Sequence, residues 1–240
     1  WQLKQERPHD PDDFTQGLVI VADRLFESTG QYGRSTVQEI ERHSGRKLRA
    51  RPVAPEAFAE GLAYAGKRLI QLSWREQTAW TYDLDLRPLA RFDYPGEGWG
   101  LTTLHTQEGE QLVLSDGTPW LRFLHPDTLA ETGRVMVRVR GQPLQRINEL
   151  ETVKGEILAN IWHCDEVAVI DPTSGAVRGW FNFAPLRARL AWPEGRRPQE
   201  TDLNGLAWDE RAQRLLVTGK YWPALFELEI GGCKSVIPPQ

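Results

Sequence analysis

A three-residue motif that recurs five times constrains the fold of this chain more than any other feature. Each copy has a polar or aromatic residue, then usually glycine, then leucine. The copies are Gln16-Gly17-Leu18, Glu60-Gly61-Leu62, Trp99-Gly100-Leu101, Asn148-Glu149-Leu150 and Asn204-Gly205-Leu206. Their leucines stand 39 to 56 residues apart, so the 240 residues have room for five units. A repeat of this length is typical of a β-propeller, in which each unit is one small sheet.

Each unit continues with two further segments that have the pattern of strands. A short turn follows the leucine, then a second apolar segment, then a third one with alternating apolar and polar residues. The third segments lie at 36–40, 79–82, 120–124, 166–170 and 224–228. We therefore predict an all-β fold, a five-bladed propeller that forms one domain over residues 1–240. A sandwich of hairpins is the alternative, but it gives no reason for the motif to recur at one place in every unit.

The N-terminal segment 2–7 precedes the first repeat and has no partner in it. The last unit, in turn, ends soon after its third strand. We expect segment 2–7 to supply the missing outer strand of the last blade, because this closes the ring and removes an exposed sheet edge.

Antiparallel strands place the chemistry on one face of this propeller. The motif starts the innermost strand of each blade, and the second strand returns to the same face. The first residues of the motifs should thus ring the mouth of the central channel, with Trp74, Trp162 and Lys220 just outside. Such a concave site with aromatic walls and a few polar groups is the usual form of a small-ligand pocket.

The composition excludes several other classes of function. The chain has 29 Lys and Arg against 33 Asp and Glu, so it lacks the basic excess that nucleic acid requires. Its longest apolar run, 18–22, is too short to span a bilayer. Two cysteines and five scattered histidines offer no zinc-ligand spacing.

Seven stretches, spread between about residues 8 and 230, match one known family in the same order. They are Asp10-Pro-Asp-Asp-Phe-Thr-Gln-Gly-Leu18, Phe26-Glu-Ser-Thr-Gly-Gln-Tyr-Gly33, Tyr94-Pro-Gly-Glu-Gly-Trp-Gly-Leu101, Asn148-Glu-Leu-Glu151, Ala159-Asn-Ile-Trp162, Leu203-Asn-Gly-Leu-Ala207 and Thr218-Gly-Lys220. They resemble the plant-type glutaminyl-peptide cyclotransferases, or glutaminyl cyclases, of plants and bacteria. The resemblance implies a five-bladed propeller that converts the N-terminal Gln of peptides or proteins to pyroglutamate, releases ammonia and needs no catalytic zinc.

The resemblance also implies roles for matching residues. Phe14 and Gln16 match a Phe-Thr-Gln-Gly motif, and Phe58 and Glu60 match an aromatic-x-Glu-Gly-Leu motif whose Glu is the family's proposed acid/base. Ala59 stands where the family suggests Gly. The expected catalytic residues are Glu60, Lys220 and Asn148. The expected substrate contacts are Phe14, Gln16, Phe58, Trp74, Trp99, Glu149, Trp162 and Asn204.

Some features of the site stay open at this stage. Burial would raise the pKa of Glu60 and a nearby Lys220 would lower it. Glu149 replaces the glycine of the motif, and its carboxylate either braces the channel or binds an ion. We expect no cofactor, with a structural Ca²⁺ in the channel left possible. Segment 187–202, rich in Arg and Pro, is expected to edge the pocket.

Two other functions compete with cyclisation. A calcium-dependent hydrolase of the lactonase type would use a ring of Glu and Asn to hold Ca²⁺, and a non-catalytic propeller would only bind a ligand. The chain begins at Trp1 rather than Met. Together with the resemblance, this leads us to expect a processed, periplasmic or secreted protein that acts as a monomer and binds no membrane.

Overall fold

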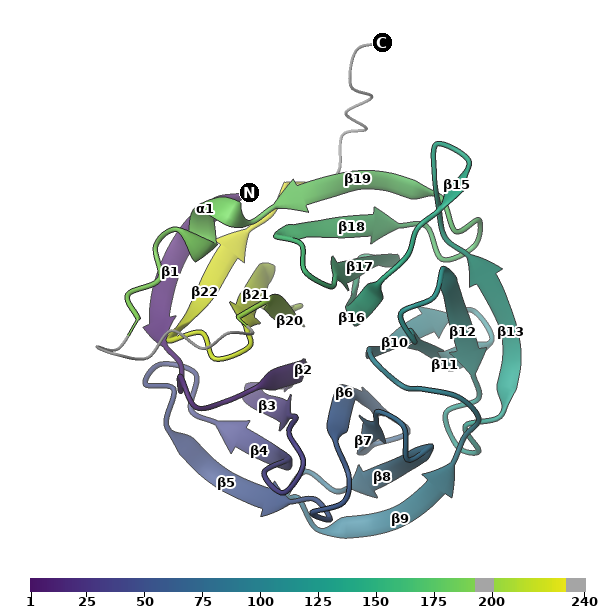
Figure 1. Ribbon diagram of the computed structural model, residues 1–240, viewed down its shortest axis with the longest axis horizontal. Helices are drawn as coiled ribbons and strands as arrows, with labels where there is room; N and C mark the ends of the chain where they lie inside the picture. Colours follow the sequence, from purple (N-terminus) through teal and green to yellow (C-terminus); the bar gives the residue numbers. More distant parts are fainter. Residues whose placement is uncertain (193–200, 232–240) are drawn as a thin grey trace.

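Five four-stranded antiparallel sheets surround a central channel in the computed structural model, which describes residues 1–192 and 201–231 (Figure 1). The innermost strands are β2 (Thr15–Val21), β6 (Ala59–Ala65), β10 (Leu101–Thr106), β16 (Ile147–Val153) and β20 (Leu203–Asp209). The second strands are β3 (Arg24–Thr29), β7 (Arg68–Ser73), β11 (Gly109–Leu114), β17 (Glu156–Ile161) and β21 (Arg214–Gly219). The third strands are β4 (Thr36–Ile40), β8 (Thr78–Tyr82), β12 (Trp120–Leu124), β18 (Glu166–Ile170) and β22 (Ala224–Glu229). The outer strands are β5 (Lys47–Pro52), β9 (Pro88–Asp93), β13 (Glu131–Met136), β19 (Val177–Asn182) and β1 (Gln2–Pro8).

The predicted five-bladed propeller is therefore confirmed, and we number its blades one to five from the sheet that begins with β2. Short elements lie outside the blades. The hairpin of β14 (Arg138–Val139) and β15 (Gln142–Pro143) joins blades three and four, and helix α1 (Ala184–Arg187) follows blade four. The described part of the chain contains no helix with the length and apolar character that crossing a membrane requires.

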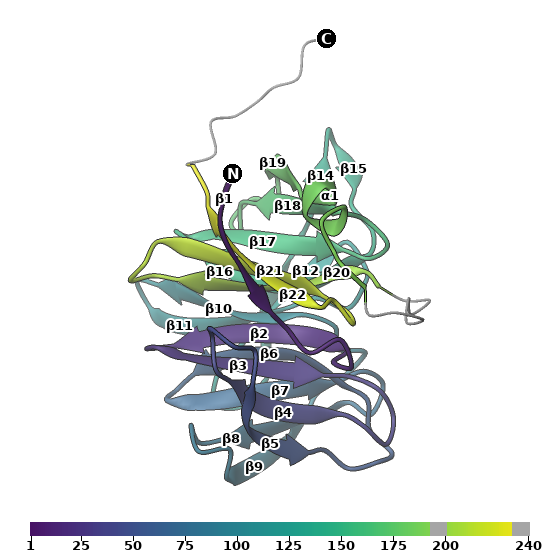
Figure 2. The ribbon, with the colours of Figure 1, turned by 90° about the vertical axis from the view of Figure 1, so that its left-hand side faces the viewer.

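The N-terminal strand closes the ring as expected. β1 pairs antiparallel with β22, from Gln2 opposite Glu229 to Pro8 opposite Ala224. Figure 2 shows β1 running alongside β22 at the edge of blade five. The first and last described strands thus complete the sheet of blade five.

The glycines of the repeated motif let neighbouring inner strands approach each other closely. A Cβ atom on Gly17 would lie 2.5 Å from the amide nitrogen of Leu62, and one on Gly61 would lie 2.5 Å from that of Leu101. At Gly100 a Cβ atom would lie 2.1 Å from the carbonyl oxygen of Asn148. These distances are too short for any side chain, so the narrow channel explains why glycine recurs.

The motif also coincides with an irregularity in strand pairing. The register shifts between Thr15 and Gly17 in blade one and between Ala59 and Leu62 in blade two. Matching shifts occur in blades four and five, at the positions that hold Asn148 and Asn204. A β-bulge re-aims the side chain that it carries. The bulges therefore let the first residue of the motif point differently from its neighbours on the strand.

The hydrophobic core is divided among the junctions of neighbouring blades. Phe26 of blade one packs in a cluster with Leu69 and Tyr82 of blade two, and Leu158 of blade four shares a cluster with Phe226 of blade five. Fully burying one such side chain stabilises the fold by about 1.5–3 kcal/mol. The blades are thus held at fixed positions, and so are the residues that they present at the channel mouth.

Candidate active site

Glu60 is the ionisable group at the centre of the predicted ring. It follows the first residue of β6 and is only 5% exposed. Burial is the largest influence and raises the pKa of Glu60 well above its ordinary value. The carboxylates of Glu76 and Glu97 raise this pKa further, whereas the ammonium of Lys220 and the amide of Gln16 lower it. The balance left open by the sequence therefore favours a raised pKa.

Lys220 stands at the end of β21, next to blade one. Its backbone N–H donates to the carbonyl of Asp202 at 2.9 Å, and its side chain is buried. The ammonium nitrogen lies 4.7 Å from the centroid of the Phe14 ring. An aromatic face attracts a cation at this distance. The ring thus helps hold a positive charge near Glu60.

A first group of aromatic rings forms one side of the site. The ring of Phe58 contacts those of Phe14, Trp74 and Tyr32 at centroid distances of 5.9, 5.7 and 5.4 Å. Phe14 also meets Tyr221 at 5.1 Å. All four contacts are edge-to-face, the arrangement that aromatic pairs prefer. The expected residues Phe14, Phe58 and Trp74 therefore do lie together, and the structure adds Tyr32 and Tyr221.

A second aromatic group comes from blades three and four. The rings of Trp99 and Trp162 meet edge to face at 5.5 Å, and His163 stacks on Trp162 at 4.1 Å. Glu97 joins the two groups, because its Oε2 accepts hydrogen bonds from the indole N–H of Trp74 at 2.8 Å and of Trp99 at 3.0 Å. Sequence reasoning missed Glu97. Its only signal is its place two residues before the Trp of a family motif.

The side-chain amide of Asn204 holds Gln16 in place. The side-chain nitrogen of Asn204 donates to Gln16 Oε1 and to the carbonyl of Thr15, both at 2.9 Å. Because Gln16 Oε1 accepts this bond, its amide N–H groups remain for the Glu60 side. Gln16 is 3% exposed, so it lies at the inner limit of the site.

Asn204 and Glu149 are almost fully buried, and both make hydrogen bonds between neighbouring inner strands. Asn204 has no exposed surface, and its side-chain N–H groups donate to Thr15 and Gln16 of the neighbouring inner strand. Glu149 is 1% exposed, and its Oε2 accepts the backbone N–H of Leu206 at 3.1 Å. Glu149 therefore braces the inner strands of blades four and five. The roles of Asn204 and Glu149 as substrate contacts stay predictions, and bracing of the channel by Glu149 is one of the two alternatives that the sequence left open.

Asn148 lies beside this wall, at the start of β16. It is 4% exposed, and its backbone carbonyl accepts the hydroxyl of Ser115 at 2.5 Å. This bond joins blade four to blade three. The backbone of Asn148 is therefore fixed at the junction of the two blades, and the catalytic role expected for its side-chain amide stays a prediction.

A buried polar cluster below Phe14 was also missed by sequence reasoning. His9 Nε2 lies 3.1 Å from Glu27 Oε1, and His9 Nδ1 lies 2.7 Å from the carbonyl oxygen of Trp222. Asp13 accepts hydrogen bonds from Gln38 at 2.7 Å and from Lys47 at 2.8 Å. The potential ligand atoms of His9, Asp13 and Glu27 lie within 4.8 Å of one another, but these bonds already engage them. The cluster ties the N-terminal segment to blades one and five.

Half of segment 187–202, which is expected to edge the pocket, falls on residues 193–200, which lie outside the described residues. At its near end, Arg187 donates to Asp165 at 2.7 Å and to the hydroxyl of Thr201 at 3.0 Å. The two described ends of the segment are therefore held together. The role that we expect for the segment stays a prediction.

Together, fold and site define a class: a β-propeller enzyme with a buried acid, an ammonium group and aromatic walls at the channel mouth. The chain matches the glutamine cyclotransferase family over residues 1–230. It is 40% identical over 232 residues to the glutaminyl-peptide cyclotransferase of Arabidopsis thaliana, covering 95% of this chain and 71% of the relative. The crystal structure of the Myxococcus xanthus glutaminyl cyclase superposes with a TM-score of 0.87 at 39% identity, over 94% of each chain. The chain therefore belongs to the glutamine cyclotransferase family, as its motifs led us to expect.

Proposed function

We propose that this protein cyclises the N-terminal glutamine of peptides and proteins to pyroglutamate and releases ammonia, with Glu60 as acid and base. The observation that carries the proposal is the buried Glu60 carboxyl group beside the Lys220 ammonium in a chain of this family. The family match favours this reaction over the calcium-dependent hydrolase and the non-catalytic propeller.

The reaction is an intramolecular aminolysis. The neutral α-amine nitrogen attacks the carbon of the substrate's own side-chain carboxamide, so one C–N bond forms and the bond to the amide nitrogen breaks. The attacking nitrogen loses one proton and the departing nitrogen gains one, which leaves pyroglutamate and ammonia. Because both reacting groups belong to one residue, the protein mainly has to hold the bent conformer.

Glu60 supplies the proton transfers in this scheme. Its carboxylate takes the proton from the attacking amine, and the resulting acid gives a proton to the departing nitrogen. General acid–base groups work best when their pKa lies near the working pH. Burial raises the pKa of Glu60, and the Lys220 ammonium opposes part of this rise.

The remaining groups stabilise charge and exclude water. Lys220, Asn148 and Gln16 are the proposed donors to the oxyanion that develops on the carboxamide oxygen; one preorganised donor is worth roughly 10²–10³ in kcat. The aromatic groups around Phe58 and Trp99 surround the reacting residue. They favour attack by the amine over attack by water, which separates a cyclase from an amidase.

Ammonia release from a peptide that begins with Gln tests the proposal. The same peptide should lose its free N-terminal amine, and a peptide that begins with Asn should do neither. Ammonia release with a free N-terminal amine would indicate hydrolysis to Glu and would contradict cyclisation. Export from the cytoplasm and a monomeric state stay predictions, which cell fractionation and sedimentation can check.

A further inference from the structure

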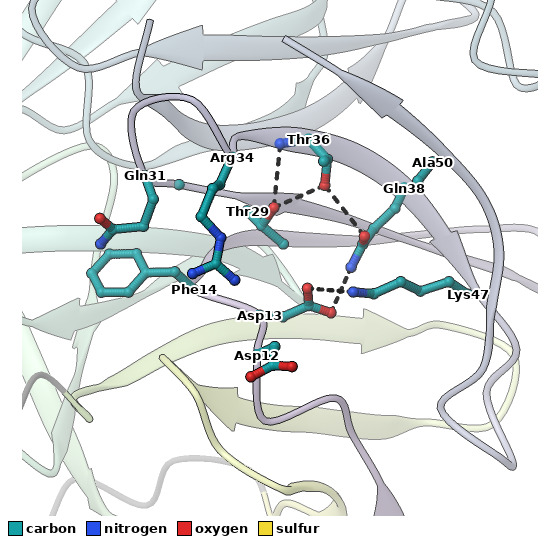
Figure 3. Close-up of a pocket in the computed structure, with 11 residues that line it drawn as sticks. Asp12, Asp13, Phe14, Thr29, Gln31, Arg34, Thr36, Gln38, Lys47 and Ala50 are labelled. Atoms are coloured by element: carbon teal, nitrogen blue, oxygen red, sulfur yellow. Dashed lines mark hydrogen bonds and ion pairs between the residues drawn. The ribbon is translucent and has the colours of Figure 1, made fainter. Parts of the chain in front are cut away.

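A cavity of about 160 Å³ opens beside the aromatic wall, on the side of blade one (Figure 3). Phe14 of the aromatic wall and the neighbouring Gly30 both line it. A Cβ atom on Gly30 would lie 2.3 Å from the Phe58 ring and 3.0 Å from Cγ of Gln16, so Gly30 directly abuts the surroundings of Glu60. One extended residue spans about 3.3–3.6 Å. A peptide whose first residue lies against Glu60 can therefore reach this cavity with its second or third residue.

Arg34 gives the cavity an unsatisfied positive charge. Its side chain is exposed and lines the cavity, and Figure 3 shows it extending toward Phe14. Across residues 1–192 and 201–231, no hydrogen bond or ion pair engages the Arg34 guanidinium. A guanidinium offers five donors in a fork that matches a carboxylate.

The other charged groups of the lining leave this guanidinium available. Lys47 forms ion pairs of 2.8 Å with both Asp13 and Asp10, and Asp13 also accepts the Gln38 amide. Asp12 is the remaining carboxylate, and Figure 3 shows it pointing away from Arg34. The positive end of the cavity is thus the end nearest Phe14.

The loop that presents Arg34 is held rigidly. Gly30 N–H donates to the carbonyl of Phe14 at 2.8 Å, and the hydroxyl of Ser35 donates to the carbonyl of Gln31 at 2.9 Å. Gln31, whose side chain also lines the cavity, has φ 104. Residues other than glycine seldom adopt such a φ, and the strain tends to occur where a structure holds a ligand-binding group in place.

From these observations we propose that this cavity is a subsite for a carboxylate on the peptide chain that follows the N-terminal Gln, with Arg34 as its specificity-determining residue. The inference rests on the proposed function, which brings the peptide to Glu60. The carboxylate has two sources, an acidic side chain at the second or third position or the free C-terminus of a dipeptide. Arg34 and the Gln31 amide donate to either one.

Peptide amides that differ at one position test the subsite. We would compare kcat/KM for Gln-Ala-Ala, Gln-Glu-Ala, Gln-Ala-Glu and Gln-Lys-Ala amides, and for Gln-Ala as the free acid and the amide. A charge-assisted bond at a partly exposed site should favour the carboxylate peptide by roughly 3–10-fold, and less so at high salt. Arg34→Ala should abolish this preference. Arg34→Glu should reverse it, so that the Gln-Lys-Ala amide becomes the better substrate. Arg87→Ala is the control, because Arg87 lies in the turn after β8, on the opposite face.

The corresponding pyroglutamyl peptides separate the subsite from the chemistry, since they bind without reacting. Their Kd should show the same dependence on a carboxylate and on Arg34. Carboxylate-dependent binding without any turnover would overturn the proposed function and support the subsite. Equal kcat/KM and equal Kd for all peptides, or a preference that persists in Arg34→Ala, would overturn the subsite.

Discussion

Replacing Glu60 with Gln tests the proposed chemistry most directly. Gln has nearly the same size and can still contact the Gln16 amide, but it cannot exchange a proton near neutral pH. If Glu60 transfers the protons, kcat should fall by roughly 10²–10⁴, the usual contribution of general acid–base catalysis. KM should change much less, because the substrate would still meet the same aromatic walls and donors.

The structure also gives the expected change in stability. Glu60 is 5% exposed, and burial raises its pKa, which means that the folded protein favours the neutral form of this group. A neutral Gln resembles that form, so the free energy of unfolding should change by less than about 1 kcal/mol. A purely structural Glu60 would instead cost about 1–3 kcal/mol when its buried hydrogen bonds are damaged, and kcat would stay nearly intact.

Steady-state ammonia release and urea unfolding of the same preparations distinguish these outcomes. Glu151→Gln is a matched control, because Glu151 is also a buried carboxyl group with a raised pKa, in its case to about 8. Glu151 lines a separate cavity of about 300 Å³ with Trp208 and Tyr64, away from the site, so this variant should keep its kcat. A Glu60→Gln enzyme with more than about a tenth of the wild-type kcat would fall outside the acid–base range and refute the assignment.

Three further predictions concern the lysine, metals and pH. Lys220→Met should lower kcat by roughly 10²-fold through loss of an oxyanion donor. It should also move the acidic limb of the kcat/KM pH profile to higher pH, because Lys220 lowers the pKa of Glu60. An acidic limb that does not move would argue against electrostatic coupling of Lys220 and Glu60. Extended EDTA treatment should leave turnover unchanged, whereas a complete loss that Ca²⁺ restores would support the hydrolase alternative. Burial opposes charge on His9, but Glu27 and Asp13 raise its pKa from 6.5 to about 9. Protonated His9 should therefore stabilise the folded protein by up to about 3 kcal/mol below pH 6.5, and this contribution should be lost as the pH rises through 9. The free energy of unfolding of the His9→Gln variant should lose this pH dependence. If the variant keeps the same pH dependence, other groups must cause it.

The sequence predicted the scaffold well because its repeated motif has a steric cause. Gly17 and Gly61 recur where inner strands approach too closely for a Cβ atom, so the motif marks the innermost strand of a blade directly. The third strands at 36–40, 120–124 and 166–170 were predicted to the residue. Their alternation reflects burial on one face, which is local information that a single sequence contains.

The parts of the site that the sequence could not predict are set by contacts between loops. Glu97 takes part because two tryptophans from different loops donate to the same oxygen. His9 and Glu27 meet because β1 closes the ring beside blade one. No periodicity records such meetings, since they depend on distant segments that come together only in the folded chain.

The placement of Asn204 and Glu60 shows how five similar positions become one asymmetric site. Both follow the first residue of an inner strand, at a shift in strand register, yet Asn204 donates within the wall while Glu60 approaches Lys220. Lys220 belongs to blade five and Glu60 to blade two, and the Lys220 ammonium also lies 4.7 Å from the centroid of the Phe14 ring, next to blade one. In the proposed mechanism, the lysine and its aromatic contact therefore lie on the side of the channel mouth next to blade one. Since the Arg34 cavity also lies over blade one, the same asymmetry that pairs the acid with the lysine would direct the rest of the peptide toward Arg34.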